Sequence, residues 1–310
     1  MINIEYIINY TVLSAFLTLF IAEVGSSFIF LINRQYYPRI KNFITPLWGP
    51  IGTFAIFYAV NTEATYPSAL SLVGTMYIAL GMAAGLFFIL RNAFIMYSEA
   101  HSDKRMDLIY RELYIVMTVI VAFLVVTIFS SAISGIGINI SQASINVLAA
   151  MFNPFNLAYF ISVVLIALSV SYVQFDVKEG GRIVPLVSAA LAYVIIIAVS
   201  EKYLQYFAPA LVSNYYALAI SLIIAAVGFI AYFLRRLISK YIMGIWLFVS
   251  IDMFGVIQYP HLFGTAAEYT QFLNNSTMAL YASYVTAIGG SLLALYLAIF
   301  FYVNYVKKAS

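Results

Sequence analysis

The sequence predicts an all-α integral membrane protein with nine transmembrane helices. Of its 310 residues, 64% are hydrophobic and only 9% are charged, and the mean hydropathy is +0.98. Soluble domains carry about 25% charged residues, so most of this chain must lie in lipid. The apolar runs are continuous rather than alternating, which favours helices over a β-barrel, the other structure that satisfies every backbone polar group inside a bilayer.

Nine apolar stretches are long enough to cross the hydrocarbon core, which takes about 20 residues of helix. We expect spans over residues 8–32, 43–60, 68–96, 113–138, 155–175, 183–200, 216–234, 241–259 and 278–303. The second stretch opens with "ITPLWGPIGTF", in which Pro46 is tolerated because the first turn of a helix has no internal acceptors for its N–H groups. Glu5, rather than a basic region, precedes the first stretch, so we expect that stretch to stay as an anchor.

The basic residues predict how the chain lies in the membrane. All but one of the 15 Lys and Arg residues fall in or beside alternate connections, and Lys202 is the exception. Because basic residues are retained on the cytoplasmic side, the N-terminus is expected outside and the C-terminus in the cytoplasm. The sequence thus predicts a multi-pass protein of the cell membrane, with loops too short for a separate extramembrane domain and no nucleic-acid partner.

Two acidic residues lie inside the expected spans. Acidic side chains are costly in lipid and are therefore candidates for function. Glu23 lies in the inner half of the first span, and Asp252 lies near the middle of the eighth. Each could take part in a proton relay, or could simply hydrogen-bond a neighbouring helix or pair with a cation. For Glu23 the candidate cation is Arg91, whose long side chain could reach back into the bundle.

The residues that bind redox cofactors are nearly absent from this chain. The sequence contains no cysteine, which excludes disulfides and iron–sulfur clusters, and its two histidines, His101 and His261, fall in connections. No pair of spans therefore offers axial haem ligands, and a redox role would require a partner subunit that holds the haem. The 26 Tyr and 25 Phe residues partly form interfacial belts, and an aromatic groove among them could also hold a quinone or a lipid tail.

Four stretches together resemble subunit II of the cytochrome bd-type quinol oxidases. They are a first span with an acid followed by glycine, "IAEVGSSFIFL"; a proline-x-tryptophan element, "TPLWGPIGTF"; a long span started by a proline, "TYPSALSLVGTMYIALGMAAGLFFILRNAFIMYSEA"; and "NPFNLAYFISVVLIALSVSYVQF". A final apolar span and a short basic tail follow. Each motif is weak alone, and their order along the whole chain carries the resemblance.

The chain also departs from this family. Where members commonly have a histidine before the tryptophan and an aspartate after it, this sequence has Leu47 and Gly49, followed by Pro50 and Ile51. In some members that aspartate is implicated in proton delivery, which this chain cannot copy. Glu23 is also the only acid of the first-span motif, where members often have two aspartates.

The resemblance implies one polytopic domain over residues 1–310, made of two four-helix bundles, 1–138 and 153–259, and a peripheral ninth helix, 278–303. It implies a haem-free subunit that supports a haem-bearing subunit I, in a complex that oxidises quinol and reduces oxygen with haem b and haem d type groups. Glu23 and Asp252 would handle protons or anchor helices, and Arg91 would be the charge partner. Trp48 would be a packing residue, and the motif residues with structural roles are Pro46, Trp48, Pro67, Asn153 and Pro154.

Two other classes of protein remain open from the sequence. A secondary transporter would explain acids inside the membrane, although its helices are commonly broken at the midplane, and the clearest interruption here, Pro46 to Gly52, lies at the end of a span. A quinone-interacting anchor of another respiratory complex would also lack haem ligands and would recruit an iron–sulfur partner.

Overall fold

The computed structural model describes residues 2–100, 104–274 and 276–301, and over this part it has nine helical segments long and apolar enough to cross a membrane. Eight are single helices: α1 (Ile4–Ile32), α4 (Pro67–Ala100), α5 (Lys104–Ser134), α7 (Pro154–Phe175), α8 (Val184–Tyr203), α10 (Tyr215–Phe233), α11 (Ser239–Gln258) and α12 (Thr277–Phe301). The remaining segment joins η1 (Arg34–Tyr36), α2 (Tyr37–Ile44), η2 (Thr45–Leu47) and α3 (Trp48–Thr65). The predicted fold class is confirmed.

The second span begins earlier than the sequence predicts. The helical segment starts at Arg34 rather than near Phe43, because the short helix α2 precedes the apolar run and is amphipathic. Its Ile40 and Ile44 are buried, whereas Arg39 is exposed, and such alternation lowers the hydropathy that marks a span. Pro46 lies in the 3₁₀ turn η2 that links α2 to α3.

The fourth span ends earlier than predicted, at Ser134 instead of residue 138. Gly135 and Gly137 have φ angles of +74° and +82°, which only glycine adopts readily, and they turn the chain into a hairpin of β1 (Ile138–Asn139) and β2 (Ser144–Ile145). At the other end of the sequence, residues 302 and 303 of the predicted ninth span lie outside the described residues.

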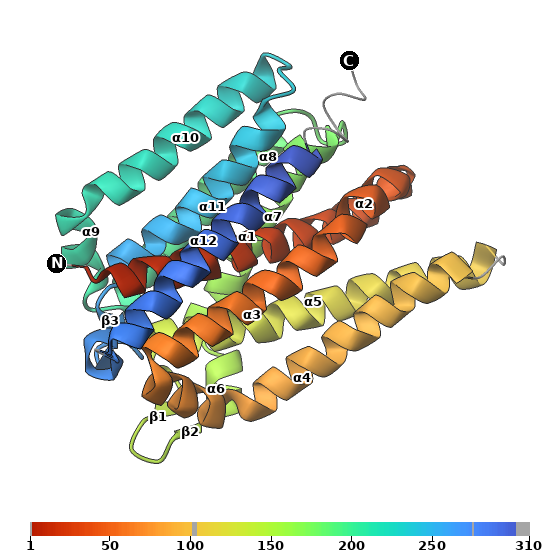
Figure 1. The fold of residues 1–310 in the computed structure, drawn as a ribbon. Helices are drawn as coiled ribbons and strands as arrows, with labels where there is room; N and C mark the ends of the chain where they lie inside the picture. The colour runs from red at the N-terminus through yellow and green to blue at the C-terminus, as the bar shows by residue number, and fades with distance from the viewer. Residues whose placement is uncertain (1, 101–103, 275, 302–310) are drawn as a thin grey trace.

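The spanning helices form two groups, and α1 belongs to the first group while also lying against the second (Figure 1). One group contains α1, α3, α4 and α5, and the other contains α7, α8, α10 and α11. Helix α12 packs against α3 and α1. Because α1 also packs along α7 and α11, the two groups share one core. The predicted division into bundles at residues 138 and 153 stays a prediction.

Short elements close one end of the helices (Figure 1). They are the hairpin β1–β2, the hairpin of β3 (His261–Leu262) and β4 (Ala267–Glu268), and the helices α6 (Val147–Met151), α9 (Phe207–Ser213) and η3 (Tyr269–Phe272). The N–H groups of Phe263 and Gly264 donate to the carbonyls of Ala132 and Ile133, at 2.7 and 2.9 Å. These bonds attach the second hairpin to the end of α5.

At the opposite end, Glu179 in the α7–α8 connection joins the two helix groups. Its carboxylate accepts hydrogen bonds from the side chains of Asn33, Gln35 and Tyr36, which follow α1. The Asn33 amide, together with these other donors, lowers the pKa of Glu179. The connection is therefore attached to the first group through a charged acceptor.

Helices α1 and α7 approach each other closely at Gly25. A Cβ placed on Gly25 would overlap the carbonyl oxygen of Ala167 and the hydroxyl of Ser171. Small residues at such a point let two backbones approach, which stabilises membrane helices through packing rather than through the hydrophobic effect. The glycine of "IAEVGSSFIFL" therefore sets the distance between the two helix groups.

We expect Gly25→Ala to destabilise the protein by about 1–3 kcal/mol, because the added methyl group has no space. Thermal unfolding in detergent, followed by circular dichroism, measures the effect. The matched control is Gly74→Ala on α4, where nothing lies within 4 Å of an added Cβ. That variant should be neutral or more stable by up to about 1 kcal/mol. Equal melting temperatures for the two variants would contradict the assignment.

Candidate functional site

The carboxylate of Glu23 is the point at which all four helices of the first group meet. Its side chain is fully buried on α1. Arg91 of α4 places Nη1 3.1 Å from Glu23 Oε2, and this side chain is fully buried as well. Trp48 Nε1, at the start of α3, and the Tyr114 hydroxyl of α5 each donate to Glu23 Oε1 at 3.1 Å. The structure thus brings together Glu23 and Arg91, the pair suggested by the sequence.

The guanidinium of Arg91 has further partners on its own helix. Nε and Nη2 lie 3.3 Å from Asn92 Oδ1, and the group stacks over the Phe88 ring, 4.2 Å from its centroid. Desolvating two opposite charges costs several kcal/mol for each ion, and close pairing with hydrogen bonds is what offsets this cost. Removing one partner alone would leave the other as an uncompensated buried charge.

Two hydrogen bonds and one ion pair converge on the carboxylate of Glu23. Trp48 and Tyr114 donate to Oε1, and Arg91 lies at ion-pair distance from Oε2, so the carboxylate has polar partners on three helices. Such an arrangement holds helices in register, because moving any of them would leave a donor or the charge unpaired. The chemistry of the site is therefore that of a polar anchor in the first instance.

A small hollow lies beside this centre. It has a volume of about 10 Å³, and its lining includes Ser27, Lys41, Arg111 and Tyr114. Arg111 stacks 3.6 Å from the Tyr37 ring and pairs with Asp107 at 2.5 Å. A single water molecule needs about 10–15 Å³, so the hollow is of the size of one water.

Asp252 lies apart from Glu23. It is partly buried on α11, and the hydroxyl of Ser14 on α1 donates to its Oδ1 at 3.3 Å. Ser14 precedes Glu23 by nine residues on the same helix, a rise of about 14 Å. The two acids suggested by the sequence are therefore on separate polar contacts, and Asp252 joins α11 to α1.

The residues of the predicted structural motifs begin helices. Pro67 is the first residue of α4, and Pro154 is the first residue of α7. Asn153 caps α7 by accepting from the Asn156 N–H at 2.8 Å, and its amide donates to the carbonyls of Ala149 and Ala150. These contacts account for the "NPFN" motif as a helix start.

Trp48 packs against the core that contains Ile44 and Leu47, and it has a second contact that the sequence did not suggest. Its indole N–H is one of the two hydrogen-bond donors to Glu23. Tyr114 was not singled out by the sequence analysis at all. A tyrosine or tryptophan inside an apolar stretch needs a partner for its polar atom, and this rule is the signal that could have drawn attention to both.

A second buried polar cluster was also missed. In the other helix group, the Tyr193 hydroxyl lies 2.8 Å from Ser250 Oγ and accepts from Trp246 Nε1 at 3.1 Å, and Ser221 Oγ lies 2.8 Å from Ser250. These residues come from α8, α10 and α11. This cluster carries no formal charge. It shows that a buried tyrosine and a buried tryptophan find hydrogen-bond partners here without an ion pair.

One of the two histidines can be placed. His261 lies in the β3–β4 hairpin with its ring 4.3 Å from the ring of Tyr206, and His101 lies outside the described residues. Over residues 2–100, 104–274 and 276–301, no group of three or more His, Cys, Asp or Glu side chains could hold a metal ion.

The fold is similar to that of a known respiratory enzyme. No family model matches the chain, and no curated protein matches its sequence. A chain of the bd oxidase from Geobacillus thermodenitrificans matches it in structure with a TM-score of 0.75 and 15% sequence identity, over 97% of this chain and 98% of the other. The chain is therefore a multi-pass membrane protein with the fold of a bd oxidase chain.

We expect Glu23→Gln to cost about 3–5 kcal/mol of stability, because it leaves Arg91 buried without its counter-charge. Combining it with Arg91→Met, which keeps an apolar chain over Phe88, should recover most of this loss. Thermal unfolding in detergent of both single variants and the double variant measures the coupling.

The control is Glu112→Gln, which breaks an exposed pair with Arg34 at 2.7 Å and should cost less than about 1 kcal/mol. Additive losses in the double variant would show that the buried pair is not coupled.

Proposed function

We propose that the chain is the haem-free subunit II of a bd-like quinol:oxygen oxidoreductase in a respiratory chain. The observation that carries this proposal is the match of the fold to a bd oxidase chain along almost the full length of both chains. The histidine placement and the four resembling stretches support the same assignment. The haem b and haem d type groups would then lie on a haem-bearing subunit I, where quinol is oxidised and oxygen is reduced to water.

In this proposal Glu23 and Arg91 anchor the first helix group of the subunit. The support is the set of polar partners around Glu23, which come from three different helices: the ion pair with Arg91 and the hydrogen bonds from Trp48 and Tyr114. A rigid group of helices gives a neighbouring subunit a fixed surface to pack against. Tyr114 and Trp48 belong to the same anchor.

Proton handling by this subunit is the alternative role for the same residues. The hollow beside Ser27 and Tyr114 would hold the last water of a route from the cytoplasm to Glu23. The second-span element does not favour a route of its own, because Leu47 is fully buried and apolar and Gly49 carries no side chain. Asp252 would belong to a separate route, since the Ser14 hydroxyl donates to it and it lies apart from the Glu23 centre.

The absorption spectrum of the purified complex tests the oxidase assignment. The chain should be isolated from its native membrane with its partners, in a detergent that preserves complexes. We expect reduced-minus-oxidised bands of b-type and d-type haem together with quinol oxidase activity. Iron–sulfur signals instead of these bands would assign the chain to another respiratory complex, and solute flux in liposomes containing the chain alone would assign it to the transporters.

The Glu23→Gln/Arg91→Met double variant distinguishes the two roles of the buried pair. Because the charges are removed together, the complex should still assemble, and a polar anchor predicts quinol oxidase turnover within about twofold of the unchanged protein. Oxygen consumption per haem is the measurement. Asp252→Asn is the matched control for a second buried acid. An assembled complex with a double variant that no longer turns over would favour proton handling by Glu23.

A further inference from the structure

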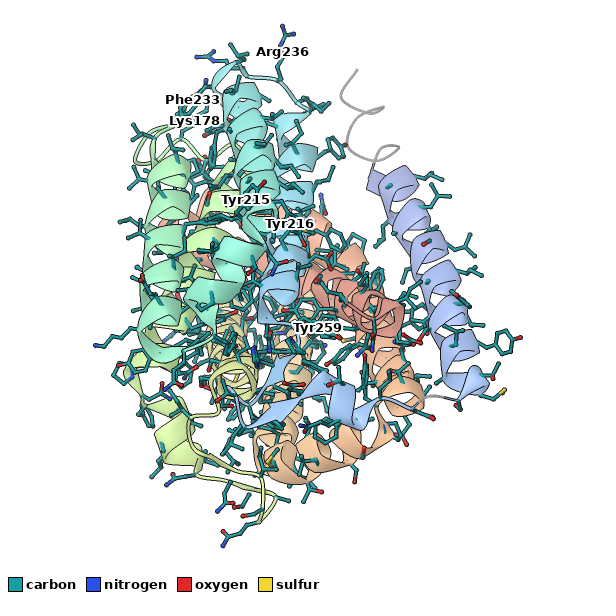
Figure 2. The ribbon with its side chains drawn as sticks, turned by 90° about the vertical axis from the view of Figure 1, so that its left-hand side faces the viewer. Lys178, Tyr215, Tyr216, Phe233, Arg236 and Tyr259 are labelled. Atoms are coloured by element: carbon teal, nitrogen blue, oxygen red, sulfur yellow. The ribbon has the colours of Figure 1, made fainter. Side chains whose placement is uncertain are left out.

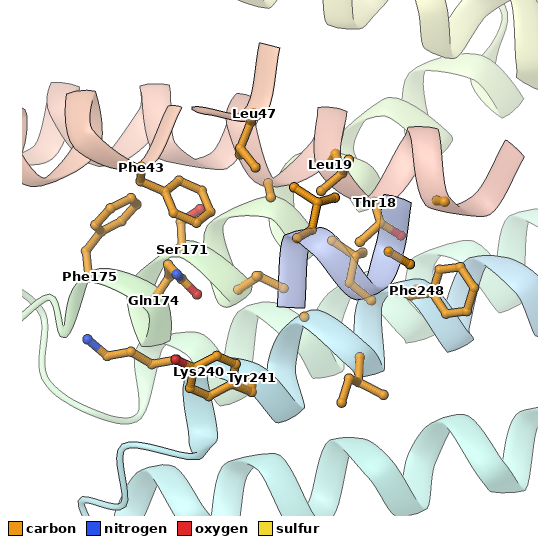
Figure 3. A pocket seen from close by; sticks show the side chains of 18 of the residues that line it. Thr18, Leu19, Phe43, Leu47, Ser171, Gln174, Phe175, Lys240, Tyr241 and Phe248 are labelled. Carbon is orange, nitrogen blue, oxygen red and sulfur yellow. The ribbon is translucent and has the colours of Figure 1, made fainter. Parts of the chain in front are cut away.

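A large cleft opens between α12 and α11, and the function proposed above does not use it. It has a volume of about 760 Å³, its floor is formed by α1 and α7, and the segment from α2 to α3 forms one wall (Figure 3). Helix α12 packs against α3 and α1 and stands beside the rest of the helices in Figure 2. The cleft is therefore a groove between helices rather than a gap inside one helix group.

Most of the cleft wall is apolar. Leu19, Phe54, Phe248 and Leu297 line it from four different helices. Along α11 the lining extends from Lys240 to Phe248, a rise of about 12 Å. Gly244 lies on this stretch, and nothing would lie within 4 Å of a Cβ placed on it. The depth and the smooth wall match a hydrocarbon chain lying along the helices.

One end of the cleft is charged. Lys240 lies at that end on the same side as Gln174 (Figure 3), and Arg39 and Asp176, which also line the cleft, are close enough to Lys240 to interact with its charge. Asp176 and Lys240 also line a neighbouring hollow of about 570 Å³, which adds four basic side chains: Lys178, Arg182, Arg235 and Arg236. Lys178 and Arg236 lie at the same end of the molecule in Figure 2. Across both spaces, six basic side chains face one acidic side chain.

We infer that this cleft binds one anionic, phosphate-bearing lipid. Its acyl or isoprenoid chain would lie along the apolar wall up to Phe248, and its phosphate would lie between Arg39 and Lys240 with the neighbouring basic residues around it. Charge-assisted hydrogen bonds from Arg and Lys to phosphate are stronger than those to neutral oxygens. Basic pockets between helices on the cytoplasmic side are typical sites for anionic head groups, and the sequence predicts that this end is cytoplasmic.

The charge at the cleft distinguishes this ligand from a neutral one. A quinone would fill the apolar part but would leave Asp176 as the one acidic group facing Arg39, Lys240 and the neighbouring basic side chains. A zwitterionic lipid would bring a second positive charge to an end that already carries an excess of basic groups. The lipid site is independent of the proposed oxidase function, because it rests only on the cleft and its charges.

Native mass spectrometry of the full-length protein, with any subunits that copurify, tests the inference. After delipidation in detergent, the protein is titrated with dioleoyl phosphatidylglycerol, with dioleoyl phosphatidylcholine and with a menaquinone. We expect one phosphatidylglycerol to be retained, with an affinity about tenfold or more above that of phosphatidylcholine.

Two kinds of variant separate the head-group end from the chain end of the cleft. Arg39→Gln combined with Lys240→Gln should lower phosphatidylglycerol affinity about tenfold or more and should leave phosphatidylcholine affinity unchanged. Gly244→Leu should also weaken binding although every charge is kept, because its side chain would project into the cleft without meeting another residue.

Matched controls keep the result interpretable. Arg34→Gln removes a basic side chain that is already paired with Glu112, outside the cleft, and Ala190→Leu adds apolar bulk on the exposed surface of α8. Both should bind phosphatidylglycerol as the unchanged protein does, and circular dichroism should show that all variants are folded. Equal affinity for the two phospholipids, or retention of the menaquinone in place of phosphatidylglycerol, would overturn the inference.

Discussion

The buried ion pair of Glu23 and Arg91 is the constraint on which the first helix group depends. A charge inside a membrane protein is tolerated only where its partners are fixed, and here the partners of Glu23 on α1 come from three other helices. The pair therefore requires α1, α3, α4 and α5 to keep one mutual arrangement. The ion pair specifies this one arrangement of the helices more than it adds to stability, since apolar replacements of both side chains can give an equally stable protein.

Helix α1 transmits that arrangement to the rest of the molecule. It carries Glu23, and two residues later Gly25 lies against α7, so the ion pair and the close approach of α1 to α7 lie on the same helical turn. Farther along, Ser14 contacts Asp252 on α11. The cleft beside α12 exists because α12 packs on α3 and α1, while α11 packs on α1 and α7. Because α11 and α12 both pack on α1 but not closely on each other, space remains between these two helices.

Polar residues in the spans are organised by the same rule in both helix groups. Water cannot satisfy a polar atom in the hydrocarbon core, and in both groups buried donors converge on an acceptor from a neighbouring helix. In the first group the acceptor is a carboxylate, and in the second it is the hydroxyl of Tyr193 with two serines. Basic residues instead collect at the helix ends, where they surround the charged end of the cleft. Polar contacts in the interior of the helix groups therefore involve neutral groups or paired charges, whereas the excess positive charge lies at the ends of the helices.

The sequence by itself determined the fold class and the number of spans, because hydropathy depends on each stretch alone and not on its neighbours. It also identified Glu23 and Arg91, since charges in apolar runs stand out. Tertiary structure decided that Trp48 and Tyr114 donate to Glu23, that Asp252 stays apart, and that α2 extends the second span. It alone placed Arg39, Gly244 and Lys240 on one cleft. Contacts between residues far apart in the chain depend on how the helices pack. The sequence pattern of one helix does not show which other helix it will contact.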